Sequence, residues 1–257
     1  MNDCCATGFL HSGTPTGSIE KLGSLDAYYS KSPIKSKAIL FLSDIFGHIS
    51  PNNQLLADAI ARKTGFTVIA PDYLHGDYID WKVLKGMVDP EKSIFGRISQ
   101  LGSILFGAPK LATWFMRQDH IKTLATVESC LNDVLLKYES IAVVGYCFGG
   151  RYTAILGNST RVKCVAMAHP SRLDIPAEIS LKVPSLWICL ENDAMFDGKA
   201  RTSAKLHLNE LKMESTFIEY PGTSHGFATR GSENDEKVVK AREKALQDVC
   251  EFFLEKM

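Results

Sequence analysis

The sequence predicts an α/β fold in which a doubly wound, mostly parallel sheet carries helices on both faces. Short apolar runs alternate with helical patterns along most of the 257 residues, which is typical of repeated βα units. The apolar fraction of 45% is ordinary for a globular protein with a sizeable core. We therefore expect one domain over residues 37–257, preceded by an irregular arm over residues 1–36 that is rich in Gly, Ser, Thr and Pro.

The expected elements follow one another in a simple order. Compact apolar runs indicate buried parallel strands at residues 37–43, 66–70, 141–144, 162–168, 185–190 and 215–220. Apolar residues at helical spacing indicate helices at residues 52–63, 121–138, 151–156, 199–212 and 235–256. The stretch from about residue 73 to residue 120 is longer than an ordinary connection. We interpret it as a helical insertion or lid over a site, although an insertion that only packs on the surface fits it as well.

Charge and cysteine content narrow the classes of function. Lys and Arg together number 29, as do Asp and Glu, so neither a nucleic acid nor a membrane is expected as a partner. The seven cysteines show no disulfide-like spacing, which fits a reducing compartment. The first residues do not resemble a secretory signal and no apolar run reaches transmembrane length, so a cytoplasmic protein is expected.

A glycine-rich turn follows the apolar run at residues 141–144. The segment Gly145-Tyr-Cys-Phe-Gly-Gly150 joins an expected strand to an expected helix, which is the setting of a nucleophile elbow. Small residues two places before and after Cys147 permit the strained turn, and a helix N-terminus favours the thiolate. Cys147 is therefore the candidate nucleophile. The alternative is a buried cysteine in an ordinary glycine-rich turn.

Two further candidates follow strand ends, in the order nucleophile, acid, histidine. Asp193 comes after the strand at residues 185–190, with Glu191 as the runner-up and Asp197 as a distant third. His225 lies between the last expected strand and the last expected helix. This order is that of α/β hydrolases, so the fold predicted is an α/β-hydrolase fold. The acid would fix the tautomer of the imidazole and stabilise the imidazolium.

The loop after the first expected strand, Ser43-Asp-Ile-Phe-Gly47, adds a possible oxyanion hole. Backbone amides of Ile45, in this loop, and of Phe148, directly after Cys147, are the expected donors. The segments GYCFGG, SDIFG, END and SHGF together resemble the dienelactone hydrolase (carboxymethylenebutenolidase) family, from about Lys37 to the C-terminus. The N-terminal CCATGFLHSGTPTG is similar to a fungal cytosolic branch of that family, some of whose members are encoded beside polyketide pathways.

The resemblance implies a hydrolase of an ester or lactone of a small organic substrate, acting through a Cys-His-Asp triad and a thioester acyl-enzyme. We expect neither a cofactor nor a metal, since the adjacent Cys4 and Cys5 are poorly placed for tetrahedral coordination and no C-x-x-C partner follows them. Asp44 matches a glutamate that helps to deprotonate the thiol in the family, with a side chain one methylene shorter. Arg230 lies near the position at which the family has an arginine that binds the substrate carboxylate, although a surface role fits Arg230 equally.

Other expectations carry less support from the residues. His169, at a strand end, and Trp81, in the insertion, are candidates to line the substrate site, although structural roles fit both. The expected oligomeric state is a monomer or a homodimer, and the resemblance suggests a place in fungal secondary (polyketide) metabolism. A thioesterase, a non-catalytic hydrolase homologue that binds a small ligand, and a redox protein remain alternatives.

Overall fold

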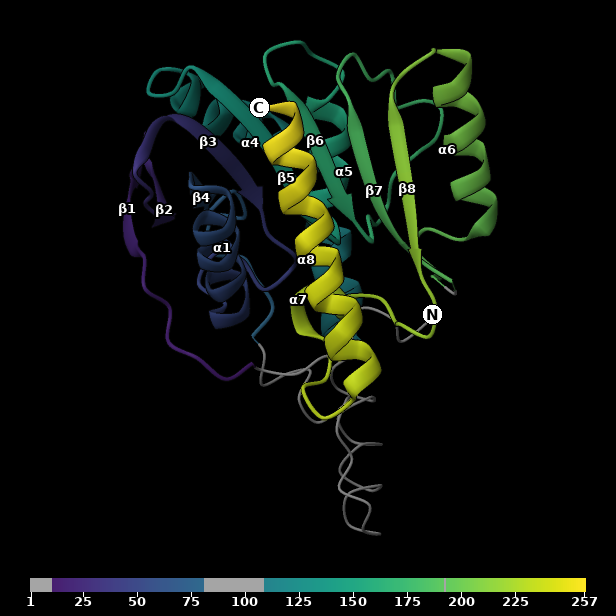
Figure 1. The fold of residues 1–257 in the computed structure, drawn as a ribbon, viewed down its shortest axis with the longest axis horizontal. Helices are drawn as coiled ribbons and strands as arrows, with labels where there is room; N and C mark the ends of the chain where they lie inside the picture. The colour runs from purple at the N-terminus through teal and green to yellow at the C-terminus, as the bar shows by residue number, and fades with distance from the viewer. Residues whose placement is uncertain (1–10, 81–108, 192) are drawn as a thin grey trace, which may run out of the picture.

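The computed structural model describes residues 11–80, 109–191 and 193–257 (Figure 1). Within these residues eight strands form one sheet in the order β1-β2-β4-β3-β5-β6-β7-β8. Strands β3 to β8 run parallel to one another. The strands are β1 (Ser18–Leu22), β2 (Leu25–Ser30), β3 (Ile34–Leu42), β4 (Phe66–Pro71), β5 (Ser140–Tyr146), β6 (Cys164–Ala168), β7 (Ser185–Leu190) and β8 (Ser215–Tyr220).

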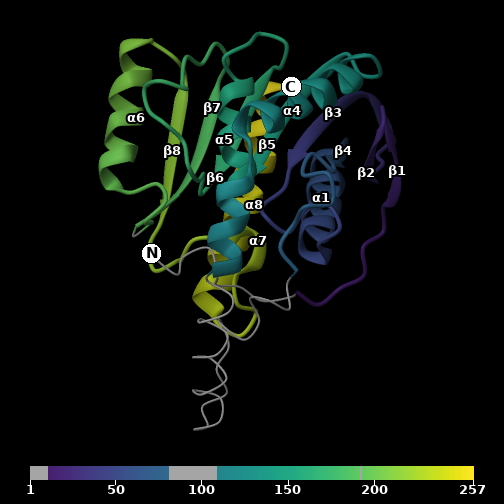
Figure 2. The same cartoon turned by 180° about the vertical axis from the view of Figure 1, so that it is seen from behind.

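Helices cover both faces of this sheet. Two of them, α1 (Pro51–Thr64) and α8 (Glu236–Lys256), pack on one face, where Ile60 and Val249 belong to the same buried cluster. The other face carries α4 (His120–Leu135), α5 (Phe148–Leu156) and α6 (Gly198–Glu210), as Figure 2 shows from behind. Residues 109–117 are also helical, and α7 (Phe227–Arg230) is a single turn. The predicted doubly wound, mostly parallel α/β fold is confirmed.

The segment expected to be an irregular arm contains two strands. β1 and β2 pair antiparallel with each other, and β2 pairs antiparallel with β4. The buried Tyr28 hydroxyl lies 2.9 Å from both carboxylate oxygens of Asp58 and accepts a hydrogen bond from the Gly17 amide at 2.7 Å. The expectation of irregular structure is therefore wrong for residues 18–30, because backbone pairing orders a sequence that carries little apolar pattern.

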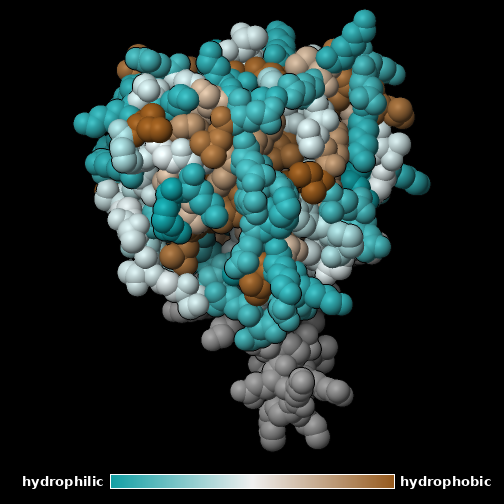
Figure 3. Space-filling model, viewed as in Figure 1, coloured by the Kyte–Doolittle hydropathy of each residue, from teal (hydrophilic) through white to brown (hydrophobic). Residues whose placement is uncertain are grey.

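The hydrophilic side chains on the surface agree with a layer of helices that covers a buried sheet. On the face seen in Figure 3, hydrophilic side chains run along α8, whose opposite side is buried against the sheet. No helix among the described residues has the length and apolar character needed to cross a membrane.

The expected lid is described only at its two ends. Residues 81–108, with Trp81, lie outside the described residues, so the lid and the substrate role of Trp81 stay predictions.

The parallel strands β3, β5, β6, β7 and β8 all end at one edge of the sheet. The register pairs Leu42 with Gly145 and Tyr146 with Ala168, so the loops after these strands leave the sheet side by side. In sheets of this kind, ligand sites lie outside the carboxyl ends of the strands. Cys147, Asp193 and His225 follow the carboxyl ends of β5, β7 and β8, and Asp44 and His169 follow those of β3 and β6.

Candidate active site

Cys147 lies at the sharp turn between β5 and α5. Its backbone has φ 51° and ψ −111°, a conformation that a residue with a side chain adopts only under strain. The neighbouring glycines make the turn possible. A Cβ at Gly145 would overlap the Thr153 side chain, and a Cβ at Gly149 would overlap the carbonyl of Leu42. The turn therefore has the strained geometry expected of a nucleophile elbow, and it holds a fully buried thiol.

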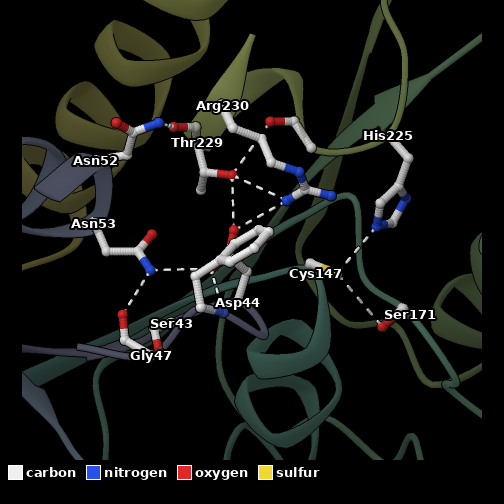
Figure 4. A network of polar contacts seen from close by, with 12 residues as sticks. Ser43, Asp44, Gly47, Asn52, Asn53, Cys147, Ser171, His225, Thr229 and Arg230 are labelled. Carbon is white, nitrogen blue, oxygen red and sulfur yellow. Dashed lines mark hydrogen bonds and ion pairs between the residues drawn. The ribbon is translucent and has the colours of Figure 1, made fainter. Parts of the chain in front are cut away.

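His225 connects the thiol to a carboxylate. Its Nε2 lies 3.1 Å from Sγ of Cys147 (Figure 4), and its Nδ1 lies 3.0 Å from each carboxylate oxygen of Asp193. All three side chains are buried. The other two acids considered lie elsewhere: Glu191 is exposed, and Asp197 caps α6 by accepting the Ala200 amide at 2.8 Å. The structure thus brings together the three residues that the sequence analysis selected.

Electrostatics favour a charged Cys147–His225 pair. Burial opposes a charge on His225, but the Cys147 thiolate and the hydrogen bond to Asp193 raise the pKa of the imidazole to about 10. Burial also opposes a charge on Asp193, yet the hydrogen bond to His225 lowers the pKa of that carboxyl below its usual value. The raised pKa of His225 favours an imidazolium beside a Cys147 thiolate, the nucleophilic form of cysteine.

A second buried network, centred on Asp44, lies beside the thiol. One Asp44 oxygen accepts hydrogen bonds from Arg230 at 3.0 Å and Thr229 at 3.1 Å, and the other accepts one from Asn53 at 2.9 Å (Figure 4). Burial raises the pKa of Asp44, Arg230 lowers it, and the nearby Cys147 charge raises it again. Asp44 is thus close enough to Cys147 for a thiolate charge to raise the pKa of its carboxyl. Its role in deprotonating the thiol stays a prediction.

Arg230 is not on the surface. Its side chain is 2% exposed, pairs with Asp44, and lies with its guanidinium 5.5 Å from the centre of the Phe46 ring. The residue belongs to α7, a four-residue turn too short to show a helical period in the sequence. The alternative of a surface role is therefore wrong, while the role in substrate binding stays a prediction.

The two expected oxyanion donors lie in adjacent loops. Ile45 follows β3 and Phe148 begins α5, and both residues are buried at the edge where β3 and β5 end. The Ile45 carbonyl accepts a hydrogen bond from the Ile79 amide at 2.9 Å, which fixes its loop. Whether the two amides receive an oxyanion stays a prediction.

The loop after β6 adds contacts that the sequence analysis did not identify. The Ser171 hydroxyl lies 3.8 Å from Sγ of Cys147, and the His169 ring centre lies 4.9 Å from that of His225. The sequence placed His169-Pro-Ser171 at a strand end but could not show which loop it would face. A role of His169 in substrate binding stays a prediction.

Aromatic residues from the described part of the insertion cover the nucleophile turn. Trp114 lies 5.0 Å from Phe115 and 5.1 Å from Phe148 between ring centres. This cluster supplies an apolar wall next to Cys147. Among the described residues no group of three His, Cys, Asp or Glu side chains is placed to hold a metal ion.

Comparison with known proteins places the chain in a family. Residues 25–257 match the model of the "Dienelactone hydrolase family". The chain is 31% identical to "Hydrolase tropI" of Talaromyces stipitatus, over 99% of this chain and 96% of that protein, and 27% identical to "Dienlactone hydrolase 1" of Gibberella moniliformis, over 97% and 91%. The solved dienelactone hydrolase from Anabaena variabilis shares the fold with a TM-score of 0.62 at 14% identity, over 96% of this chain and 100% of that one. The chain therefore belongs to the dienelactone hydrolase family and is a carboxylic ester hydrolase.

Proposed function

We propose that the protein hydrolyses an ester or lactone of a small organic substrate through an acyl-enzyme on Cys147. The observation that carries the proposal is the continuous contact from Asp193 through His225 to the thiol. In this arrangement a nucleophile, a general base and an orienting acid lie within hydrogen-bond reach of one another.

The first half of the reaction forms a thioester. The Cys147 thiolate attacks the carbonyl carbon, and the carbonyl oxygen becomes an oxyanion that accepts hydrogen bonds from the Ile45 and Phe148 amides. The tetrahedral intermediate collapses, the carbon–oxygen bond to the leaving group breaks, and the imidazolium of His225 protonates the departing alkoxide. A lactone opens in the same step, since its leaving alkoxide stays attached to the acyl group.

The second half releases the acid. Neutral His225 takes a proton from water as the water oxygen attacks the thioester carbonyl. Collapse of the second tetrahedral intermediate breaks the carbon–sulfur bond and returns the thiolate beside the imidazolium. Asp193 keeps Nδ1 of His225 protonated throughout, so that Nε2 faces the reacting atoms.

The surroundings of Cys147 support a substrate with an apolar or aromatic body. Trp114, Phe115 and Phe148 lie beside the nucleophile turn. Arg230, which lies near the position of the family's carboxylate-binding arginine, is already paired with Asp44. A substrate dicarboxylate would have to compete with Asp44 for that guanidinium. A place in fungal secondary (polyketide) metabolism rests on the resemblance of the N-terminal segment and on the similarity to fungal hydrolases.

The test is a screen of aryl esters, lactones and thioesters with wild type, Cys147→Ala and Cys147→Ser. We expect wild type to turn over at least one ester or lactone and Cys147→Ala to be inactive with an unchanged melting temperature. A Cys130→Ser control changes a buried cysteine in α4 and is expected to keep full activity. Full turnover by Cys147→Ala would exclude the proposed mechanism. A preference for thioesters over esters would favour a thioesterase.

The acyl-enzyme can be observed directly. His225→Gln removes the base that activates water, so a reactive aryl ester is expected to leave its acyl group on the protein. Intact-protein mass spectrometry should show one added acyl group, and peptide mapping should place it on Cys147. An adduct on another residue would contradict a thioester intermediate on Cys147.

A further inference from the structure

His169 lies directly beside the nucleophile, just after the neighbouring strand β6. The parallel register pairs Tyr146 with Ala168, so Cys147 and His169 are the next residues along β5 and β6. The Cys147 amide donates to the Ala168 carbonyl at 3.0 Å, and the Ser171 amide donates to the Cys147 carbonyl at 3.0 Å. This backbone pairing fixes the place of His169 relative to the thiol.

The ring of His169 is buried without the partners that a buried imidazole normally has. Its exposed fraction is 0%, and neither ring nitrogen has a hydrogen-bond partner among the residues that the structure describes. Its backbone is also strained, with φ 40°. A buried polar group without partners and a strained backbone both cost stability, so a histidine that combines the two calls for a functional explanation.

The neighbours of His169 are aromatic or already paired. Its ring centre lies 4.9 Å from that of His225 at an interplanar angle of 60°, and it also lies 6.1 Å from Tyr146 and 6.0 Å from Phe227. Both nitrogens of His225 are already engaged by Cys147 and Asp193. The two imidazoles therefore meet edge to face, and not through a hydrogen bond.

The charged and titratable groups around this ring keep it neutral. Burial, the charge of His225 and the charge of Arg230 on α7 hold the pKa of His169 well below its usual value. Tyr146, on β5, is also neutral because burial raises its pKa. The negative charges near the pair sit on Cys147, on Asp193 after β7, and on Asp44, which is itself paired with Arg230.

We propose that His169 is a positioning residue whose neutral ring stabilises the imidazolium form of His225, and through it the Cys147 thiolate. A cation over the face of a neutral aromatic ring, within about 6 Å of its centre, is attracted by the ring quadrupole, and the T-shaped contact at 4.9 Å suits this attraction when His169 presents its face to His225. The same contact holds the His225 ring in the plane that joins Cys147 to Asp193. The inference rests on the proposed role of the Cys147–His225 pair in catalysis.

The direction of the effect follows from where the proton rests. Without the aromatic ring the imidazolium is less stable, so His225 gives its proton back to Cys147 and the thiolate fraction falls near neutral pH. Above the range in which a free thiol ionises the thiolate forms regardless, so the difference disappears there. His169→Leu removes the aromatic ring at similar volume, whereas His169→Phe keeps an aromatic ring without nitrogens.

The test is a titration of the thiolate by its absorbance at 240 nm, with the matching Cys147→Ala protein subtracted. We expect His169→Leu to need a higher pH for half-ionisation, equivalent to about a three- to thirtyfold smaller thiolate-to-thiol ratio near neutral pH. His169→Phe is expected to stay within about twofold of wild type. His75→Leu is the matched control, because His75 also has a positive φ, of 53°, but is exposed.

Steady-state kinetics on an accepted ester give an independent readout. His169→Leu should lower kcat and leave KM unchanged, since the ring acts on His225 and not on the substrate. An unchanged titration in a folded His169→Leu protein would overturn the inference. So would an equal loss in His169→Phe, since that result would mean that packing of the imidazole alone matters.

Histidine NMR on wild type keeps the inference testable if His169→Leu does not fold. With ¹⁵N-labelled histidine, His169 is expected to carry one ring proton at every pH between 5 and 9, and its signals should move when Cys147→Ala removes the ion pair. A doubly protonated His169 at pH 7 would overturn the inference. Failure of the proposed function would look different: wild type would turn over no ester, while the thiolate titration would still separate the two His169 variants.

Discussion

Nδ1 of His225 lies at the same distance, 3.0 Å, from both carboxylate oxygens of Asp193. The carboxylate is held in turn by the Met195 amide, which donates to it at 2.8 Å. One acid therefore fixes both the tautomer and the orientation of the imidazole, and its charge stabilises the imidazolium.

Asp193→Asn should lower kcat by about 10³- to 10⁴-fold, because the amide neither stabilises the imidazolium nor selects the productive tautomer. Steady-state kinetics on an accepted ester provide the measurement. Glu191→Gln is the matched control and should keep wild-type activity. Asp197→Ala should cost about 1 kcal/mol of unfolding free energy through loss of a helix cap, without a change in kcat. A comparable loss of kcat in Glu191→Gln would show that the assignment of Asp193 as the acid is wrong.

The parts of the fold with a strong local pattern could be predicted from the sequence. The expected strands at residues 185–190 and 215–220 coincide with β7 and β8, and the glycine-rich turn was located with its reactive residue at the correct strand end. For both strands and for the turn, residues adjacent in the sequence specify the structure. A compact apolar run predicts a buried strand, and flanking glycines predict a strained turn.

The features that were missed depend on distant residues. β1 and β2 have little apolar pattern and are ordered by pairing with β4. Arg230 and Asp44 are 186 residues apart, so their ion pair exists only after α7 packs beside the loop that follows β3. The contact between His169 and His225 likewise depends on how two strand-end loops meet, which no local pattern encodes.

Turnover should fall as pH rises through about 10. Burial lowers the pKa of His225, but the Cys147 thiolate and Asp193 raise it to about 10, so the imidazolium is present below that pH and is lost above it. The imidazolium protonates the leaving alkoxide, so the decline should be steep for alkyl esters. Aryl esters, whose leaving groups need no proton, should lose much less. Rates corrected for spontaneous hydrolysis between pH 7 and 10.5 give the comparison. Identical profiles for the two classes would argue against His225 as the acid.

Removing one partner of the buried Asp44–Arg230 pair should destabilise the protein strongly. Both side chains are nearly inaccessible, at 1% and 2% exposure, so Arg230→Met leaves an unpaired buried carboxylate. We expect a loss of about 3–5 kcal/mol in unfolding free energy, measured with urea. The double variant Asp44→Asn, Arg230→Met should recover part of that loss. Lys240→Met, which breaks the exposed pair with Glu236, should cause no measurable change. A double variant less stable than both single ones would show that the two charges do not compensate each other.

Gly226 should tolerate alanine far less well than Gly222, although both have a positive φ, of 88° and 71°. A Cβ at Gly222 meets nothing within 4 Å, so Gly222→Ala should cost only the backbone strain, about 1–2 kcal/mol. A Cβ at Gly226 would overlap the guanidinium of Arg230.

Gly226→Ala must therefore displace the ion pair with Asp44 as well as strain the residue next to His225. Its loss of stability should exceed that of Gly222→Ala, and its kcat should fall while Gly222→Ala keeps wild-type kcat. Urea unfolding and steady-state kinetics on the two variants measure both effects. Equal losses in the two variants would mean that the guanidinium moves aside freely, and that the Asp44–Arg230 pair does not hold the His225 loop in place.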